Sequence, residues 1–145
     1  MTVLFICRAN TGRSQIAETF FNKMAPEGWQ AISGGTLVNN KEHKRVMDRP
    51  KIEPLLRSMK EASFDIGRNI RKEITPEMVR SADRIVVMAE PETIPDFLRG
   101  NSNTEYWDVP DPKEVVYEEM NKVRDVIQEK VLGLIRDIGG NPTLS

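Results

Sequence analysis

The chain opens with a short apolar run that passes directly into a loop and then into a helical pattern. Residues 3–6 are continuously apolar and β-prone, which is typical of a parallel strand buried on both faces. From about Ser14, apolar residues recur at the spacing of an amphipathic helix. The loop of residues 7–14 therefore joins the end of a strand to the start of a helix. Its backbone amides are predicted to form a nest for an oxyanion, since unpaired N–H groups and the helix dipole both favour negative charge.

Two side chains give this loop its predicted chemistry. Cys7, the only cysteine of the chain, opens the loop, and a thiol in an anion-binding nest ionises easily to the nucleophilic thiolate. Arg13 follows six residues later, and its planar guanidinium can grip two oxygens of a phosphate-like group. The pattern predicts a phosphoryl-transfer site in which Cys7 attacks phosphorus and Arg13 stabilises the transition state. The other candidate site residues, which bind phosphate or brace the loop, are Arg8, Ala9, Asn10, Thr11, Gly12 and Ser14.

The rest of the chain alternates short strands with helices. Further strands are expected at residues 30–33, 85–88 and 104–107, and helices at residues 14–25, 54–62, from Thr75 onward and at 116–138. This alternation predicts an α/β fold, formed by one domain over residues 1–145. We expect a doubly wound four-stranded parallel sheet with helices on both faces and an anion-binding loop after the first strand.

The composition limits which kinds of binding partner and which cell compartment are expected for the protein. A net charge of −1 argues against nucleic acid or an anionic membrane as the principal partner. No apolar stretch approaches the roughly 20 residues that span a bilayer, and the N-terminus lacks a signal-peptide pattern. One cysteine permits no intrachain disulfide, which fits a reducing cytoplasm. Cys7 and a single histidine, His43, also argue against a structural zinc site.

The motif Cys7-x-x-Asn10-x-x-Arg13-Ser14, placed directly after the first strand, resembles the signature of the low-molecular-weight protein tyrosine phosphatase family. The thioredoxin-coupled arsenate reductases share that fold and loop. Three further segments resemble the family in its order, at residues 33–36, 81–88 and 107–112. The resemblance spans nearly the whole chain and implies a hydrolase for a phosphorylated protein or a small phosphomonoester. No cofactor or metal is expected, because the nest and Arg13 supply the positive field that a metal would provide.

The same resemblance assigns roles to three more side chains. Asp111, in the segment Trp-Asp-Val-Pro-Asp-Pro, is the candidate general acid, which would protonate the leaving oxygen and then activate water. Asp108, three residues earlier, is the alternative acid. It could instead cap or brace the turn, and the resemblance to the Asp-Pro motif favours Asp111 as the acid. Asn10 is implied to brace the loop, and Ser14 to donate a hydrogen bond to the sulfur of Cys7.

The chain departs from the family pattern at three places. Gly12 stands where many relatives carry a second cysteine, so that disulfide cannot form here. Asp111 and Pro112 are followed by Lys113, Glu114 and Val115 rather than by a tyrosine. The segment that begins at Lys41 and ends at Lys51 is long and rich in cations. It is either a substrate-facing flap for an anionic or non-aromatic phosphomonoester or a solvated surface loop, and phosphotyrosine specificity is not predicted.

Three other functions compete with phosphoester hydrolysis. Arsenate fits the same nest, but the thioredoxin-coupled reductases need two further cysteines, so only a reductase using an external small thiol is compatible with this sequence. A phosphocarrier that phosphorylates its cysteine needs neither Arg13 nor an Asp-Pro loop. A silent phosphate-binding module needs no nucleophile. The sequence therefore favours a hydrolase that uses Cys7, Arg13 and Asp111.

Overall fold

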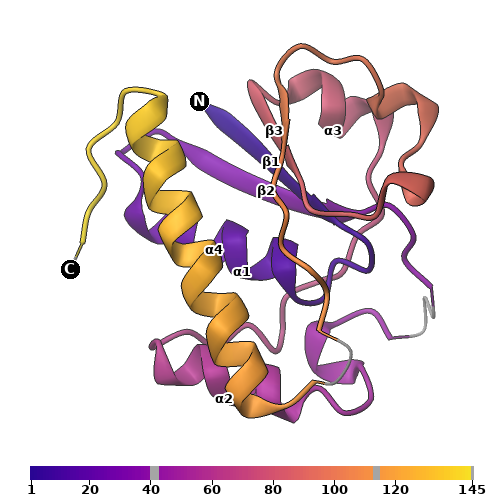
Figure 1. Ribbon diagram of the computed structural model, residues 1–145, viewed down its shortest axis with the longest axis vertical. Helices are drawn as coiled ribbons and strands as arrows, with labels where there is room; N and C mark the ends of the chain where they lie inside the picture. Colours follow the sequence, from indigo (N-terminus) through magenta and orange to yellow (C-terminus); the bar gives the residue numbers. More distant parts are fainter. Residues whose placement is uncertain (40–42, 113–114, 145) are drawn as a thin grey trace.

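The computed structural model describes residues 1–39, 43–112 and 115–144. Its centre is a parallel sheet formed by β1 (Thr2–Cys7), β2 (Gln30–Gly35), β3 (Arg84–Val87) and β4 (Thr104–Tyr106), seen in Figure 1. The strand order is β2-β1-β3-β4, and every neighbouring pair is parallel. The predicted four-stranded parallel sheet is confirmed.

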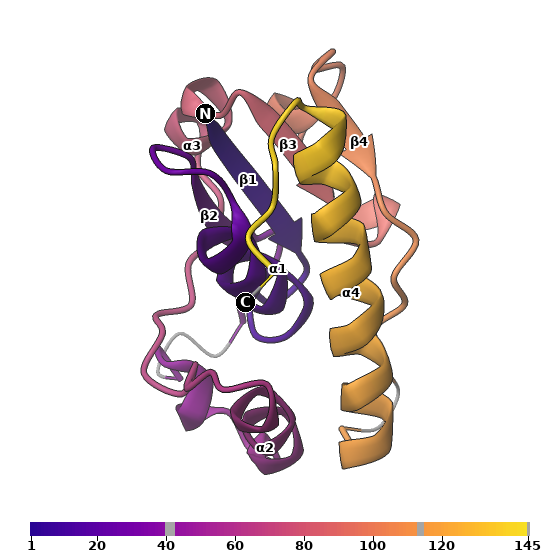
Figure 2. The ribbon, with the colours of Figure 1, turned by 90° about the vertical axis from the view of Figure 1, so that its left-hand side faces the viewer.

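Helices cover both faces of this sheet, as predicted. The helices are α1 (Arg13–Met24), α2 (Glu53–Glu61), α3 (Pro76–Ser81) and α4 (Tyr117–Asp137). Figure 2 shows α4 along one side of β1 and α3 on the other. Short 3-10 turns lie at Val46–Asp48, Pro91–Thr93 and Asp96–Leu98. The predicted cap of α3 is present, since the Thr75 hydroxyl accepts a hydrogen bond from the amide of Met78 at 3.2 Å.

Most element ends differ from the expectation by one or two residues, and β2, expected at residues 30–33, continues to Gly35. Two further boundaries lie near the end of the chain. The last strand was expected to include Trp107, but β4 ends one residue earlier and the amide of Trp107 donates to the carbonyl of Val87 at 2.9 Å. The last helix was expected from Val116, but Val116 has an extended backbone, with φ −118° and ψ 153°, and caps the helix instead. Both are shifts of a single residue at a boundary, where local patterning is weakest.

The central strand β1 sends alternate side chains into two separate cores. Val3, Phe5 and Cys7 belong to the cluster under α1 and α4, whereas Leu4 and Ile6 belong to the cluster under α3. The Phe5 ring packs edge-on to Phe21 with a centroid distance of 5.9 Å. Because both faces of β1 are covered, the residue at its carboxyl end is held by packing on either side.

All four strands are parallel, so the loops that follow them meet at one edge of the sheet. Gly35, the last residue of β2, lies against the loop that follows β1. A Cβ atom at Gly35 would stand 2.6 Å from the carbonyl oxygen of Arg8 and 3.0 Å from the amide nitrogen of Asn10. Because Gly35 has no side chain, β2 can lie close to the loop of residues 7–14, which we name the nucleophile loop after its proposed nucleophile Cys7.

We expect Gly35→Ala to displace the loop and to lower the free energy of unfolding by about 1–3 kcal/mol, the usual cost of overpacking. Urea unfolding checks this. Gly133→Ala on α4 is the matched control, because its Cβ would meet no atom within 4 Å, and it should stabilise the protein by about 0.5–1 kcal/mol. Equal urea midpoints for Gly35→Ala and the wild type would contradict the close approach.

Candidate functional site

Three consecutive carbonyl groups of the nucleophile loop are tied to the outside of the loop. The carbonyl of Cys7 accepts from the amide of Thr36 and that of Arg8 from the amide of Leu37, both at 2.9 Å. The carbonyl of Ala9 accepts from the guanidinium of Arg71. In a planar trans peptide the C=O and the following N–H point in opposite directions, so these bonds turn the next three amides away from the surrounding protein.

The amides from Arg8 to Ser14 are the groups for which the sequence predicted an anion-binding nest. Within the described residues, no amide from Arg8 to Ser14 donates a hydrogen bond to the protein. Gly12 precedes α1 and offers no side-chain cap to the first turn of the helix. The amides of the loop and of the helix start are thus available to one oxyanion, as N–H groups at a helix N-terminus commonly are.

Asn10 braces the loop with a fully buried side chain. Its Nδ2 donates to the hydroxyls of Ser14 at 2.8 Å and Ser33 at 3.0 Å. Its Oδ1 accepts from the amide of Lys72 at 2.9 Å and from Nε2 of Gln15 at 3.1 Å. The backbone of Asn10 is left-handed, with φ 51°, a conformation that asparagine tolerates better than most residues. The geometry agrees with the bracing position that the sequence predicted.

Cys7 lies at the base of the loop with 2% of its surface exposed. Its Sγ is 2.9 Å from the hydroxyl oxygen of Ser14. Since that hydroxyl already accepts from Asn10, its own hydrogen is free to be donated to the sulfur.

The Arg13 guanidinium is buried, with 4% of its side chain exposed. Nη1 donates to the carbonyls of Met88 and Val109, and Nη2 donates to Oε1 of Glu90 at 3.2 Å. Nε makes no hydrogen bond to a described residue and lies 3.8 Å from Oδ1 of Asp111. The fork is therefore oriented by Nη1 and Nη2, and its Nε, which makes no hydrogen bond to a described residue, faces the carboxylate of Asp111.

Cys7, Arg13 and Asp111 border one small cavity of about 140 Å³. Ala9, Thr11 and Gly12 line it as well, whereas Arg8 is exposed and Asn10 and Ser14 lie buried behind it. The side chain of Asp111 is 63% exposed, at the mouth of the cavity. Asp108 is exposed and does not line the cavity. Of the two predicted acids, only Asp111 therefore lies beside the cysteine.

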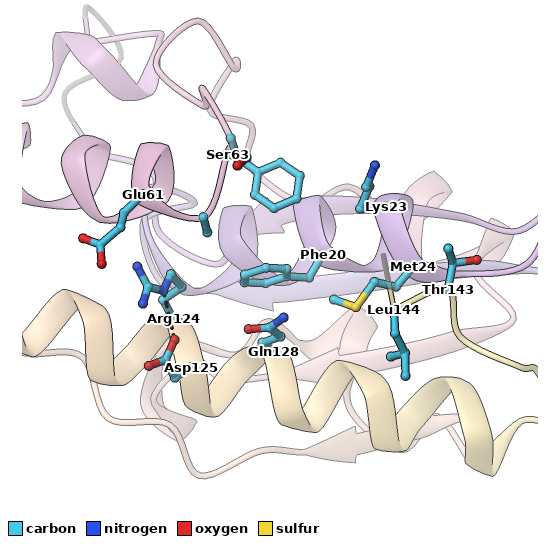
Figure 3. A pocket seen from close by; sticks show the side chains of 12 residues that line it. Phe20, Lys23, Met24, Glu61, Ser63, Arg124, Asp125, Gln128, Thr143 and Leu144 are labelled. Carbon is cyan, nitrogen blue, oxygen red and sulfur yellow. Dashed lines mark hydrogen bonds and ion pairs between the residues drawn. The ribbon is translucent and has the colours of Figure 1, made fainter.

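A second, larger cavity of about 570 Å³ lies away from this loop. Figure 3 shows its walls, which include Phe20 and Met24 from α1 and Arg124 and Gln128 from α4. None of the predicted catalytic residues borders it. Chemistry at the cysteine is thus confined to the smaller cavity.

Comparison with known proteins places the chain in a family. The family model of the low molecular weight phosphotyrosine protein phosphatases matches residues 2–142. The chain belongs to this family. Within the described residues, no helix is both long and apolar enough to span a membrane.

The relatives and structural neighbours of the chain carry several named activities. "Arsenate reductase 2" of Staphylococcus haemolyticus is 28% identical over 131 residues, which cover 90% of this chain and 92% of that protein. A low molecular weight protein tyrosine phosphatase from T. tengcongensis is 24% identical with a TM-score of 0.71, covering 94% of this chain and 99% of that one. A thioredoxin-dependent arsenate reductase from Corynebacterium glutamicum is 22% identical with a TM-score of 0.68, covering 94% and 61%. The two solved structures share the fold of this chain, and the names of these three proteins include both a phosphatase and arsenate reductases.

Arg71 is a site residue that sequence reasoning missed. It is 6% exposed and holds Ala9 O with Nε at 3.2 Å and Nη2 at 3.1 Å. Its Nη1 donates to the carbonyl of His43 at 2.6 Å. Burial lowers the pKa of Arg71, the like charge of Arg49 lowers it further, and the sulfur of Cys7 raises it. No local pattern marks this arginine, because its partners are distant backbone carbonyls.

Glu90 is the second residue that the sequence did not indicate. It follows β3 and pairs through Oε1 with Arg13, while its Oε2 is buried without a hydrogen-bond partner among the described residues. No sequence pattern predicts an acidic side chain at a site that is expected to bind an anion. Its position here is explained by Arg13, whose charge offsets the burial of the carboxylate.

A further carboxylate, that of Glu18, lies close to Ser33, a partner of the Asn10 side chain. Burial raises the pKa of Glu18, and the positive charge of Lys72 and a hydrogen bond with Ser33 partly oppose this rise. Ser33 also accepts from Asn10, so the layer behind the nucleophile loop is polar and interconnected. Such layers hold a loop in one conformation when their members are satisfied.

We expect Arg71→Met to weaken oxyanion binding, because the carbonyl of Ala9 loses the two guanidinium donors and keeps only the long bond from the Thr11 hydroxyl at 3.4 Å. Inorganic phosphate should then protect the cysteine from iodoacetamide only at about 10-fold higher concentration, since one lost hydrogen bond to a charged group costs about 1.5–3 kcal/mol. Arg71→Lys should fall between, as an ammonium cannot form the fork. Arg68→Met, at an exposed position nearby, is the control. Unchanged protection in Arg71→Met would show that the tie is dispensable.

Proposed function

We propose that the protein hydrolyses phosphomonoesters through a phosphocysteine intermediate. The observation that carries the proposal is that Cys7, Arg13 and Asp111 border one cavity whose loop amides have no partner among the described residues. A nucleophile, a cation and a carboxyl group at one anion-binding nest are what displacement at phosphorus requires. The single thiol suits a reducing compartment, and the cytoplasm is the proposed location.

In the first step the thiolate of Cys7 attacks phosphorus and the bond from phosphorus to the leaving oxygen breaks. Asp111 delivers a proton to that oxygen, so the product leaves as a neutral alcohol or phenol. The loop amides and Nε of Arg13 stabilise the charge on the three equatorial oxygens. The hydroxyl of Ser14, 2.9 Å from the sulfur, stabilises the thiolate before attack.

In the second step water attacks the phosphocysteine and the bond between sulfur and phosphorus breaks. Asp111, now a carboxylate, accepts the proton from this water. Inorganic phosphate leaves and the thiolate of Cys7 is restored with its hydrogen bond to Ser14. The exposed position of Asp111 at the cavity mouth supports both roles, because the leaving group and the attacking water use the same side of phosphorus in succession.

We expect metal-independent release of phosphate from p-nitrophenyl phosphate by the wild type. Cys7→Ser should abolish it, and Asp111→Asn should lower kcat about 100-fold or more, the usual contribution of a general acid. Asp108→Asn is the matched control and should retain near-normal turnover. Full activity in Asp111→Asn together with a loss in Asp108→Asn would transfer the acid role to Asp108.

Arsenate reduction is the second candidate, favoured by the names of relatives at 28% identity such as that of S. haemolyticus. The thiolate would displace water or hydroxide from arsenate and form a sulfur–arsenic(V) adduct. An external thiol would attack that sulfur, giving a mixed disulfide and arsenite, and a second thiol would release Cys7. The chain supplies one cysteine, so both reducing equivalents would come from the external thiol.

The two functions are separated by one pair of assays. Incubation with arsenate and excess small thiol should yield little arsenite relative to phosphate released from p-nitrophenyl phosphate. Arsenite formation that depends on the thiol and on Cys7, with no phosphate release, would replace the hydrolase by the reductase.

A further inference from the structure

The cations of the segment between residues 41 and 51 have different surroundings. Arg45 forms an ion pair with Asp48 at 3.0 Å. Lys44 borders a different cavity with His43 and Arg71. Lys51 is exposed, and Lys41 lies outside the described residues. Among the described cations of this segment, Arg49 alone borders the cavity of Cys7.

Among the charged residues that the structure describes around this cavity, Arg49 is the one without an ion pair to a described residue. The cavity is bordered by three charged residues, Arg13, Arg49 and Asp111, and Arg13 already faces Glu90 and Asp111. The guanidinium of half-buried Arg49 makes no hydrogen bond or ion pair with a described residue. The like charge of Arg49 lowers the pKa of Arg71. An anion bound near the loop would offset the repulsion between Arg49 and Arg71, because its negative charge attracts both guanidinium groups.

The other walls of the cavity are aliphatic. Pro50, Ile52 and Leu55 follow Arg49 in the chain, and Pro112, Val115 and Met120 follow Asp111. None of the described lining residues is aromatic. With a volume of about 140 Å³, the cavity suits a short aliphatic group beside the oxyanion and offers no ring for stacking.

We propose that Arg49 is a specificity residue that binds a second anionic group, a carboxylate or a further phosphate, on a small aliphatic phosphomonoester. The inference rests on the proposed hydrolase function and names its class of substrate. The nest and Arg13 bind the phosphoryl group, the aliphatic walls contact the short carbon chain, and Arg49 receives the second anion through its planar fork.

The test measures binding without turnover. Non-hydrolysable phosphonates with a terminal carboxylate and one to three methylene groups protect the cysteine from iodoacetamide, and their neutral amides serve as matched probes. Ethane-1,2-diylbisphosphonate tests the phosphate in place of the carboxylate. In the wild type, the best acid or the bisphosphonate should protect at a concentration at least about 10-fold lower than the amides, as expected for a charge-assisted pair.

Arg49→Met should reduce this preference to about 2-fold or less and leave protection by the amides unchanged. Arg49→Lys should keep part of it, and Lys51→Met, which removes the exposed neighbouring cation, should keep all of it. Equal protection by acids and amides in the wild type, or an undiminished preference in Arg49→Met, would overturn the inference. If the preference depends on Arg49 but p-nitrophenyl phosphate is not hydrolysed, the anion subsite stands and the hydrolase proposal fails.

Discussion

The buried amide of Asn10 is the interaction on which the arrangement of the site depends. Its two hydrogens and its oxygen are all used, in bonds to Ser14, Ser33, Gln15 and the backbone of Lys72. These partners belong to α1, to β2 and to the segment that precedes α3. One side chain thus joins three parts of the fold, and it does so from a left-handed residue inside the nucleophile loop. A buried amide with every donor and acceptor satisfied specifies one conformation, because each alternative leaves a polar atom unpaired.

The ties on the outside of the loop complete that arrangement. The amides of Thr36 and Leu37 hold two loop carbonyls, and their position follows from the parallel register of β1 and β2, in which Cys7 is aligned with Gly35. Gly35 brings the two backbones close enough for these bonds. The availability of the loop amides for the proposed anion is therefore a consequence of sheet geometry. The amides lack protein partners because the carbonyls beside them are fixed on the opposite side.

Local sequence patterns predicted the parts of the site that are local. The loop from Cys7 to Ser14 joins one strand to one helix, so its amides and its nucleophile could be predicted from the order of residues. Asp111 could be placed only through a motif resemblance, since 104 positions separate it from Cys7. Arg71 and Glu90 were missed because their partners are a distant carbonyl and a distant guanidinium, and neither contact leaves a periodic or compositional trace. The environment of Arg13 was missed for the same reason, as its partners include Met88 and Val109.

Those partners give Arg13 a mechanical role beside its electrostatic one. Nη1 connects the end of β3, through Met88, with the loop that carries Asp111, through Val109. Cys7 ends β1 and Arg13 begins α1, at the two ends of one short loop. The guanidinium of Arg13 therefore helps to fix the position of the Asp111 loop relative to the sulfur of Cys7. A lysine at this position could carry the charge but could not bond both carbonyls and still present a second edge to the oxyanion. In the proposed mechanism the rigid fork of Arg13 therefore allows one residue both to position the loop of Asp111 and to face the substrate, which accounts for a buried cation with carbonyl partners at this site.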